Sequence, residues 1–376
     1  MKKLKEIKKE LALLDVNVRG GISKQKIIVF ESDDWGSERM PSLNTYYALL
    51  KNNIPVDKSV YCKYDTLELN EDIQFLSEEL HSFGNKNIHK PIFTLNFVSG
   101  NPDFLKIKEA QFEQYFFESI IKTYKKYSNS DKVLDLIFEG MKYSYFTPQF
   151  HGRDHVNVPL WMGLLRTNSK YKTAFEYGMW GLSNDVMPEI SKSIQATYDS
   201  LDYNYTSNSI KEGLETFEKI FDFSSKTFIA NNYIWSDSLL PILQERGIIH
   251  LQTMKYQLLP LVGDGRRKKI RRPYGSKNKY GMTYAPRNCT FEPSIFGETH
   301  LDTLRQIKRA FFYKKPAIIS THRINFVGRM NVFNRDKNLI ELRKLLFQIY
   351  RLWPDVIFLS SDQLHGLIQN QATKIQ

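Results

Sequence analysis

Three groups of polar residues each follow a short apolar run, and their residue types could perform acid–base or metal chemistry. They are the adjacent acids Asp33 and Asp34, the histidines His151 and His155, and His322. Two histidines four residues apart share one face of a helical turn, and a tight loop can also direct both rings at one ion. With one carboxylate they would supply the three protein ligands of a catalytic zinc, which leaves a fourth position for water.

Each group also has an ordinary structural interpretation. Adjacent carboxylates repel each other unless a cation or donor compensates, but Asp is also a common helix cap and turn residue. The spacing of His151 and His155 can be fortuitous in a chain with eight histidines, and His322 could be a core-edge residue bonded to the backbone. A metal site follows only if the fold brings the three groups together.

The runs that precede these groups have the composition of buried strands, and helical spacing separates them. Residues 26–31 form a β-branched run that ends just before the two acids. Further strands are expected at 91–97, 148–151, 226–230, 248–251, 316–321 and 355–359, and helices at 42–51, 70–83, 107–126, 131–145, 239–246, 299–312 and 334–352, with 158–222 mainly helical. This alternation predicts a parallel α/β sheet whose strands end at one shared rim. We expect a barrel-like sheet, with an open doubly wound sheet as the alternative.

The 376 residues are interpreted as one decorated domain whose core spans about residues 22–368. Residues 1–20 are expected to form a basic amphipathic helix that could contact a membrane surface. Residues 263–281 contain the run Arg266–Arg272 and are expected to be an exposed basic loop.

Composition narrows the partners and the location. Lys plus Arg number 53 and Asp plus Glu 41, and the net charge of +12 favours anionic neighbours. A charge run is usually a solvated face and no nucleotide-binding motif occurs, so no nucleic-acid partner is expected. Two cysteines are too few for a disulfide scaffold, and neither a signal peptide nor a membrane-spanning run is found, so we expect a cytoplasmic protein. The oligomeric state stays open.

In their order and strand placement, the three groups resemble the polysaccharide deacetylases of the NodB-like carbohydrate esterase family. In that family the first strand ends in Asp-Asp-Gly, a later loop supplies His-x-x-x-His, and a late strand ends in Leu-x-His. The corresponding segments here are Asp33-Asp34-Trp35-Gly36, His151 to His155 and Ser320-Thr321-His322, so the resemblance spans about residues 26–360. Trp35 is inserted before the glycine, and Gly152 stands where the family usually has Ser or Thr.

The resemblance implies an irregular parallel (β/α) barrel with long helical insertions. It also implies a divalent ion, zinc by preference, on Asp34, His151 and His155, with Asp33 as general base and His322 as general acid. The family further has an Arg-x-Pro-Tyr motif that orients the base, but Asn231-Asn232-Tyr233 follows the corresponding strand here. The literal match to this motif at 271–274 lies in the basic loop and is interpreted as fortuitous. The candidates to replace the missing guanidinium are Arg153, Arg287 and Arg323.

The function implied is a hydrolase that removes an acyl group, most simply acetyl, from a glycan or polysaccharide precursor. The residues expected to contact that substrate are Trp35, Tyr233, Trp235, Arg153 and Arg323. Glu292, in Phe291-Glu292-Pro293, could be an acid of a substrate loop, but the more common interpretation, a carboxylate that faces solvent, is expected. A metal-dependent glycosyltransferase that uses the Asp33–Asp34 pair is an alternative, but it leaves the histidines unexplained. A catalytically decayed glycan- or anion-binding protein is the other, and it would show weak, salt-sensitive binding without metal.

Overall fold

Apolar runs that alternate with helices build one parallel sheet. In the computed structural model, which describes residues 15–84, 89–263 and 266–373, nine strands of these residues form that sheet. The strand order is β10-β7-β6-β5-β2-β1-β12-β11, with β13 beside β1, and every neighbouring pair is parallel. The strands are β1 (Ile27–Trp35), β2 (Phe93–Phe97), β5 (Phe146–Phe150), β6 (Thr227–Phe228), β7 (His250–Thr253), β10 (Thr283–Pro286), β11 (Cys289–Thr290), β12 (Ala317–His322) and β13 (Ile357–Phe358).

The two outermost strands of this order, β10 and β11, are separated by only two residues of chain. The first of these, Arg287, donates its backbone N–H to Thr253 O of β7 at 2.8 Å, and the second, Asn288, donates to Ile318 O of β12 at 3.1 Å. This two-residue seam therefore joins one edge of the sheet to the other, and the sheet curls into an irregular barrel. The prediction of a parallel barrel-like sheet is confirmed, and the open doubly wound alternative was wrong.

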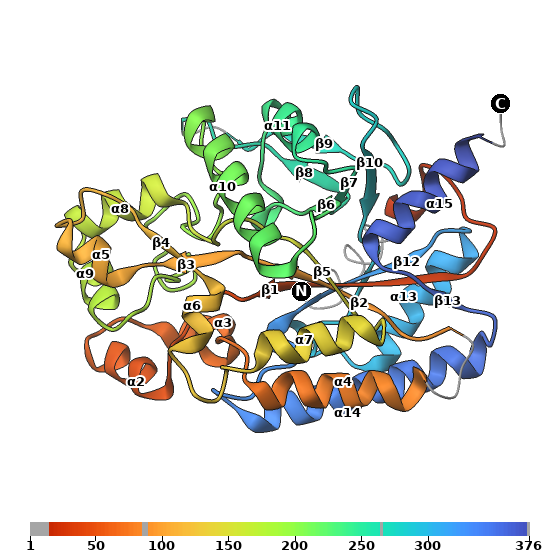
Figure 1. Ribbon diagram of the computed structural model, residues 1–376, viewed down its shortest axis with the longest axis horizontal. Helices are drawn as coiled ribbons and strands as arrows, with labels where there is room; N and C mark the ends of the chain where they lie inside the picture. Colours follow the sequence, from red (N-terminus) through yellow and green to blue (C-terminus); the bar gives the residue numbers. More distant parts are fainter. Residues whose placement is uncertain (1–14, 85–88, 264–265, 374–376) are drawn as a thin grey trace.

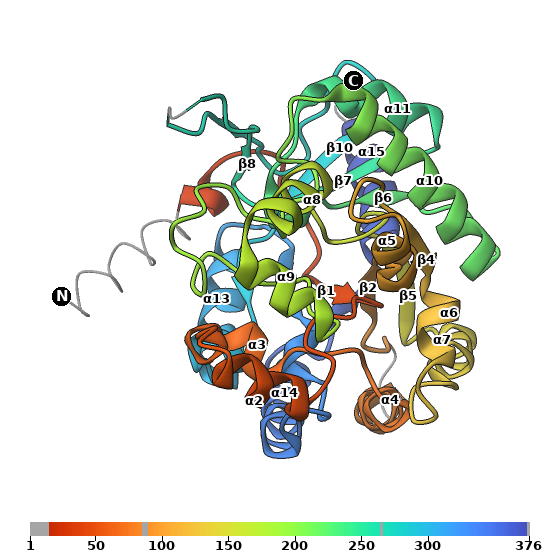
Figure 2. The ribbon, with the colours of Figure 1, turned by 90° about the vertical axis from the view of Figure 1, so that its left-hand side faces the viewer.

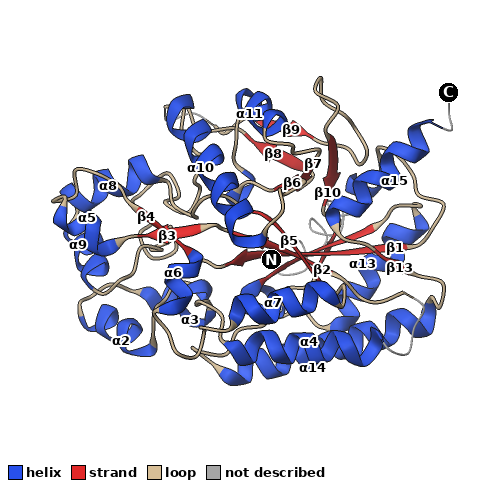
Figure 3. Cartoon of the chain, in the orientation of Figure 1, coloured by secondary structure: helices blue, strands red, loops and turns tan. Residues whose placement is uncertain are grey.

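Helices surround the sheet on its outer side (Figures 1 and 3). The long helices α4 (Asn70–Gly84) and α14 (Val332–Leu352) pack side by side along one flank (Figure 1). Further α-helices of the described residues are α2 (Leu43–Lys51), α3 (Val60–Tyr64), α5 (Phe104–Glu109), α6 (Ile120–Lys125), α7 (Val133–Lys142), α8 (Val158–Thr167), α9 (Ser169–Glu176), α10 (Tyr203–Phe221), α11 (Leu240–Glu245), α12 (Pro293–Phe296), α13 (His300–Phe312) and α15 (Ser361–Thr373). None of the helices in the described part of the chain has the length and apolar character needed to cross a bilayer.

The long insertions after β1, β2 and β5 gather at one end of the barrel. Figure 2 shows α2, α3, α5, α8 and α9 grouped around the end of β1. They have an apolar core of their own, which includes Met40 and Leu49 from the first insertion, Ile107 from the second, and Trp161 and Phe175 from the third. Because the insertions pack on one another, they can hold side chains over the rim where the parallel strands end.

Two of the predicted helical stretches are interrupted. The segment 107–126 is not one helix, because Gln111 and Phe112 have positive φ and residues 117–119 pair as β4 (Phe117–Ser119) with β3 (Gly100–Pro102). The segment 158–222 is helical only in α8, α9 and α10. Gly178, with φ of 72°, follows the end of α9 and begins a long non-helical stretch.

The basic segment 263–281 was wrongly expected to be only an exposed loop. Its residues Lys269–Arg271 form β9, which pairs antiparallel with β8 (Tyr256–Leu258). Arg271 binds Asp15, and Arg272 binds Asp237, so these cations are neutralised locally. The arginines of the literal Arg-x-Pro-Tyr match therefore pair with Asp15 and Asp237, and not with the proposed base Asp33. Of the predicted N-terminal helix 1–20, residues 1–14 lie outside the described residues.

Candidate active site

The three groups of polar residues meet at the carboxyl ends of the strands. Asp33 of β1 pairs in register with His322 of β12, and His151 directly follows β5. Asp34 has a left-handed backbone with φ of 77°, and the pairing of β1 with β2 shifts register between Ser32 and Trp35. This irregularity breaks the usual alternation of a strand, so both acids can reach the same side.

Asp33 and Asp34 line a pocket of about 330 Å³ at the strand ends. The other residues that line it are His151, His155, His322, Arg39, Tyr61, Gln195, Ala230, Asn232 and Tyr233.

One acid and two histidines form a buried cluster of possible metal ligands. Single ligand atoms of Asp34, His151 and His155 all lie within 4.8 Å of one another. Asp34 Oδ1 is 3.4 Å from His151 Nε2 and 3.1 Å from His155 Nε2. The structure therefore brings together the three residues that the resemblance implied as ligands.

The hydrogen bonding of this cluster fits a divalent cation. His151 Nδ1 lies 3.1 Å from the carbonyl oxygen of Ile229 and can donate there, and Nε2 is the nitrogen that faces Asp34. Burial and the neighbouring Arg39 guanidinium lower the pKa of His155 to about 4, so this imidazole is neutral at pH 7. Two imidazoles and a carboxylate are a typical donor set for zinc.

Asp33 lies in a different environment from its neighbour. Arg287 donates from Nη1 to Asp33 Oδ2 and from Nη2 to Asp33 Oδ1, both at 2.7 Å, and Asn96 donates to Oδ1 at 2.7 Å. Burial alone would raise the pKa of the Asp33 carboxyl, but Arg287 reverses this effect and holds the pKa below its usual value. Asp33 is therefore a fixed carboxylate that can accept a proton.

Among the three arginines considered for the missing guanidinium, the structure places Arg287 beside Asp33. Arg153 instead binds Asp154 and Glu212, and Arg323 binds Asp65 and Glu68. Neither Arg153 nor Arg323 is among the residues that line the pocket. Both side chains are buried, so the expectation that they contact substrate is corrected: they stabilise the insertions.

His322 is held by an acid whose role the sequence did not predict. Its Nδ1 lies 2.6 Å from Glu292 Oε1, and its Nε2 lies 3.8 Å from Asp33 Oδ2. Burial would favour the neutral imidazole, but the Glu292 carboxylate outweighs it and raises the pKa of His322 to about 9. Glu292 is 2% exposed and does not face solvent as expected. The sequence signal for Glu292 was its place in Phe291-Glu292-Pro293, before the predicted helix 299–312.

Only one of the three aromatic residues expected at the substrate lines the pocket. It is Tyr233, whose hydroxyl accepts a hydrogen bond from Arg287 Nη1 at 3.1 Å. Trp35 is fully buried and donates from Nε1 to Ser32 Oγ at 2.9 Å, and Trp235 packs edge-on against Phe228 in the core. The expectation that Trp35 and Trp235 contact the substrate is corrected accordingly. Arg39, Tyr61, Gln195 and Asn232, none of which the sequence pointed to, line the pocket instead.

The Trp35→Ala variant is expected to lose about 3–5 kcal/mol of unfolding free energy, because it opens a cavity in a close-packed core. Chemical denaturation measures this loss. Phe333→Ala, at an 86% exposed position, is the matched control and should change stability by no more than about 0.5 kcal/mol. A stable Trp35→Ala protein with a raised KM would instead return Trp35 to the substrate site.

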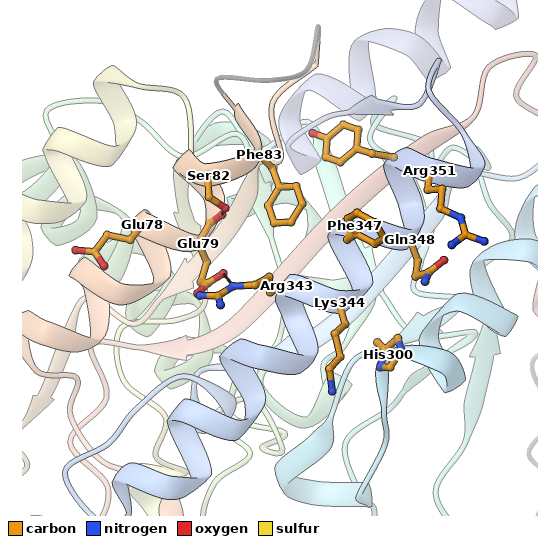
Figure 4. A pocket seen from close by; sticks show the side chains of 11 residues that line it. Glu78, Glu79, Ser82, Phe83, His300, Arg343, Lys344, Phe347, Gln348 and Arg351 are labelled. Atoms are coloured by element: carbon orange, nitrogen blue, oxygen red, sulfur yellow. Dashed lines mark hydrogen bonds and ion pairs between the residues drawn. The ribbon is translucent and has the colours of Figure 1, made fainter.

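A larger pocket, of about 880 Å³, lies on the outside of the barrel between α4 and α14 (Figure 4). Arg343 donates to Glu79 at 2.9 Å across this pocket, and Lys344 donates to Glu341, which lies outside it, at 2.9 Å. None of the three polar groups reaches this pocket. The smaller pocket at the strand ends is therefore the candidate active site.

Comparisons with known proteins agree with this fold. No family model matches the chain, and no curated protein matches its sequence. Among solved structures, a protein from Parabacteroides distasonis, provisionally described as a glycoside hydrolase/deacetylase, is similar over 93% of this chain and 72% of its own, at 10% identity and a TM-score of 0.50. A protein from Mycobacterium smegmatis, provisionally described as a polysaccharide deacetylase, is similar over 94% of both chains, at 11% identity and a TM-score of 0.46.

The chain is also similar, over 90% of its length, to a 4-alpha-glucanotransferase from Thermococcus litoralis, at 10% identity and a TM-score of 0.44. It spans only 40% of that longer protein. The likeness to the Parabacteroides protein concerns the fold. The fold is thus a NodB-like parallel (β/α) barrel, and the predicted resemblance to the polysaccharide deacetylases is confirmed at the level of the fold.

Proposed function

We propose that this protein is a metal-dependent hydrolase that removes an acyl group, most simply acetyl, from an amide or ester on a glycan. The observation that carries the proposal is the division of labour between two adjacent acids. Asp34 faces the Nε2 atoms of two histidines, as a metal ligand would, whereas both oxygens of Asp33 are held by Arg287. The glycan is proposed because the three motifs resemble those of polysaccharide deacetylases.

The pocket residues support a simple sequence of proton transfers. A divalent ion on Asp34, His151 and His155 would lower the pKa of a water molecule and stabilise negative charge on the substrate carbonyl oxygen. Asp33 takes the proton from the attacking water, and Arg287 keeps this base ionised and fixed in direction. His322, protonated through Glu292, donates a proton to the leaving nitrogen or oxygen.

Elemental analysis and an acetate-release assay test this proposal together. Purified protein is expected to contain close to one divalent ion per chain, and to release acetate from acetylated chitooligosaccharides. A chelator should stop acetate release, and added zinc should restore it. Acetate release that is insensitive to the chelator, or protein that never binds a divalent ion, would contradict the proposal.

The rate is expected to fall at alkaline pH as His322 loses its proton. Since the pKa of His322 is raised to about 9, the acid is present below that pH and kcat/KM should decline above it. Glu292→Gln removes the carboxylate that raises this pKa, so the decline should begin at lower pH. Glu176→Gln, which removes an acid from the half-exposed pair with Lys108, is the control and should leave the profile unchanged. An unshifted profile in Glu292→Gln would assign the alkaline limb to another group.

A further inference from the structure

One pocket residue, Arg39, places a cation directly against the proposed metal ligands. Its Nη2 lies 3.1 Å from Asp34 Oδ2 and 3.3 Å from His155 Nε2, and its Nε lies 3.1 Å from Asp65 Oδ2. The guanidinium also lies over the Tyr61 ring, 4.7 Å from its centroid. The side chain is 4% exposed, so these contacts lie in a site from which water is largely excluded.

Arg39 is the first cation of a buried chain of ion pairs that leads away from the pocket. Asp65 binds both Arg39 and Arg323, and Arg323 Nη1 donates to Glu68 at 2.7 Å. Glu68 in turn accepts a hydrogen bond from the backbone N–H of Gly36, two residues after Asp34. This chain anchors Arg39 on the side of Asp65, while its Nη2 reaches toward Asp34 and His155.

Two of these contacts bear on metal binding. A divalent ion on this site needs the Nε2 lone pair of His155, which Arg39 Nη2 approaches in the present structure. Arg39 Nη2 also pairs with Asp34 Oδ2. The other carboxylate oxygen, Oδ1, faces both histidines and is therefore the one that can bind the ion. An ion that enters must therefore displace Nη2 from His155 and must lie beside a fixed positive charge.

We propose that Arg39 is a built-in counter-ion of the metal site, which holds Asp34 and His155 in place without metal and weakens the affinity for the divalent ion. This inference rests on the proposed function only in its use of the same three ligands. It makes Arg39 a positioning residue that tunes metal affinity. If Arg39 were only structural, its replacement would weaken metal binding. If Arg39 is a counter-ion, its replacement strengthens metal binding, so the two roles predict opposite changes in metal affinity.

A calorimetric titration of metal-free protein with Zn²⁺ alone tests whether loss of Arg39 raises or lowers the zinc affinity. Arg39→Met is expected to bind zinc at least tenfold more tightly than the unaltered protein, and its metal-free form should melt at a lower temperature. Arg323→Met is the matched control, because it removes the next cation of the same buried chain but touches neither Asp34 nor His155. It should lower the melting temperature without a comparable gain in zinc affinity.

Equal or weaker zinc binding by Arg39→Met, in a protein whose unaltered form binds zinc, would overturn this inference and leave the proposed hydrolase intact. Zinc binding by neither protein would overturn both. A zinc-loaded crystal structure of the unaltered protein covers the case in which Arg39→Met does not fold. There, Nη2 should have left His155 while Nε stays on Asp65, and an unmoved Nη2 would contradict the inference.

Discussion

Asp34→Asn is expected to lose the divalent ion and acetate release together, whereas Asp33→Asn should keep the ion and release acetate about 10²–10⁴-fold more slowly. The two acids are adjacent in the sequence, yet their surroundings differ. Asp34 shares its Oδ1 with two imidazole nitrogens, and Asp33 is bound through both oxygens by Arg287. Removing a ligand charge weakens metal binding, but removing the base leaves the ion in place.

Metal content and turnover of both variants, measured on the same preparations, separate the two roles. Circular dichroism should show that both variants stay folded. Equal metal loss in the two variants would contradict the division of roles. Full turnover by Asp33→Asn would remove this residue from the mechanism and direct attention to His322 as the base.

Arg287→Met should be the most destabilising single change at the site, and it should also slow turnover. Arg287 is fully buried and binds Glu31 through Nε at 2.7 Å as well as Asp33. Its loss leaves two buried carboxylates without their cation, which typically costs about 3–5 kcal/mol. Without the guanidinium, the pKa of Asp33 rises, so a smaller fraction of the base is ionised and the acidic limb of the rate profile moves to higher pH.

Urea denaturation and a pH–rate profile measure the two effects of Arg287→Met. Arg246→Met provides the control, because Arg246 forms a partly exposed pair with Glu215 that should contribute no more than about 1 kcal/mol. If Arg287→Met kept full turnover and an unshifted acidic limb, the guanidinium would be only a structural partner of Glu31.

The strands and the three polar groups could be predicted because they depend on local patterns. The run 26–31 forms most of β1, and the acids, His151 and His322 all fall at strand ends, where parallel strands place side chains at one rim. The spacing of His151 and His155 was informative for the same reason. Both lie in one short loop after β5, so no distant part of the chain decides whether they meet.

The supporting residues could not be predicted because they act across long sequence distances. Glu292 meets His322 only because β11 lies beside β12, and Arg39 meets His155 only because two insertions pack together. Trp35 follows the two acids, so its sequence position suggested the substrate side. The backbone irregularity at Asp34 instead turns the indole into the core, and a sequence pattern gives no sign of such a change.

The two-residue seam has a consequence for how the protein acquires its activity. Arg287 lies in the seam, and it reaches Asp33 across a sequence separation of 254 residues. Contacts of such long range usually form late in folding, because the chain entropy of loop closure opposes them. Closure of the barrel and positioning of the Asp33 carboxylate by Arg287 then occur together. A chain whose last strands have not yet docked carries every proposed metal ligand but no oriented base. A nascent or partly opened molecule is therefore expected to lack hydrolytic activity until the barrel has closed.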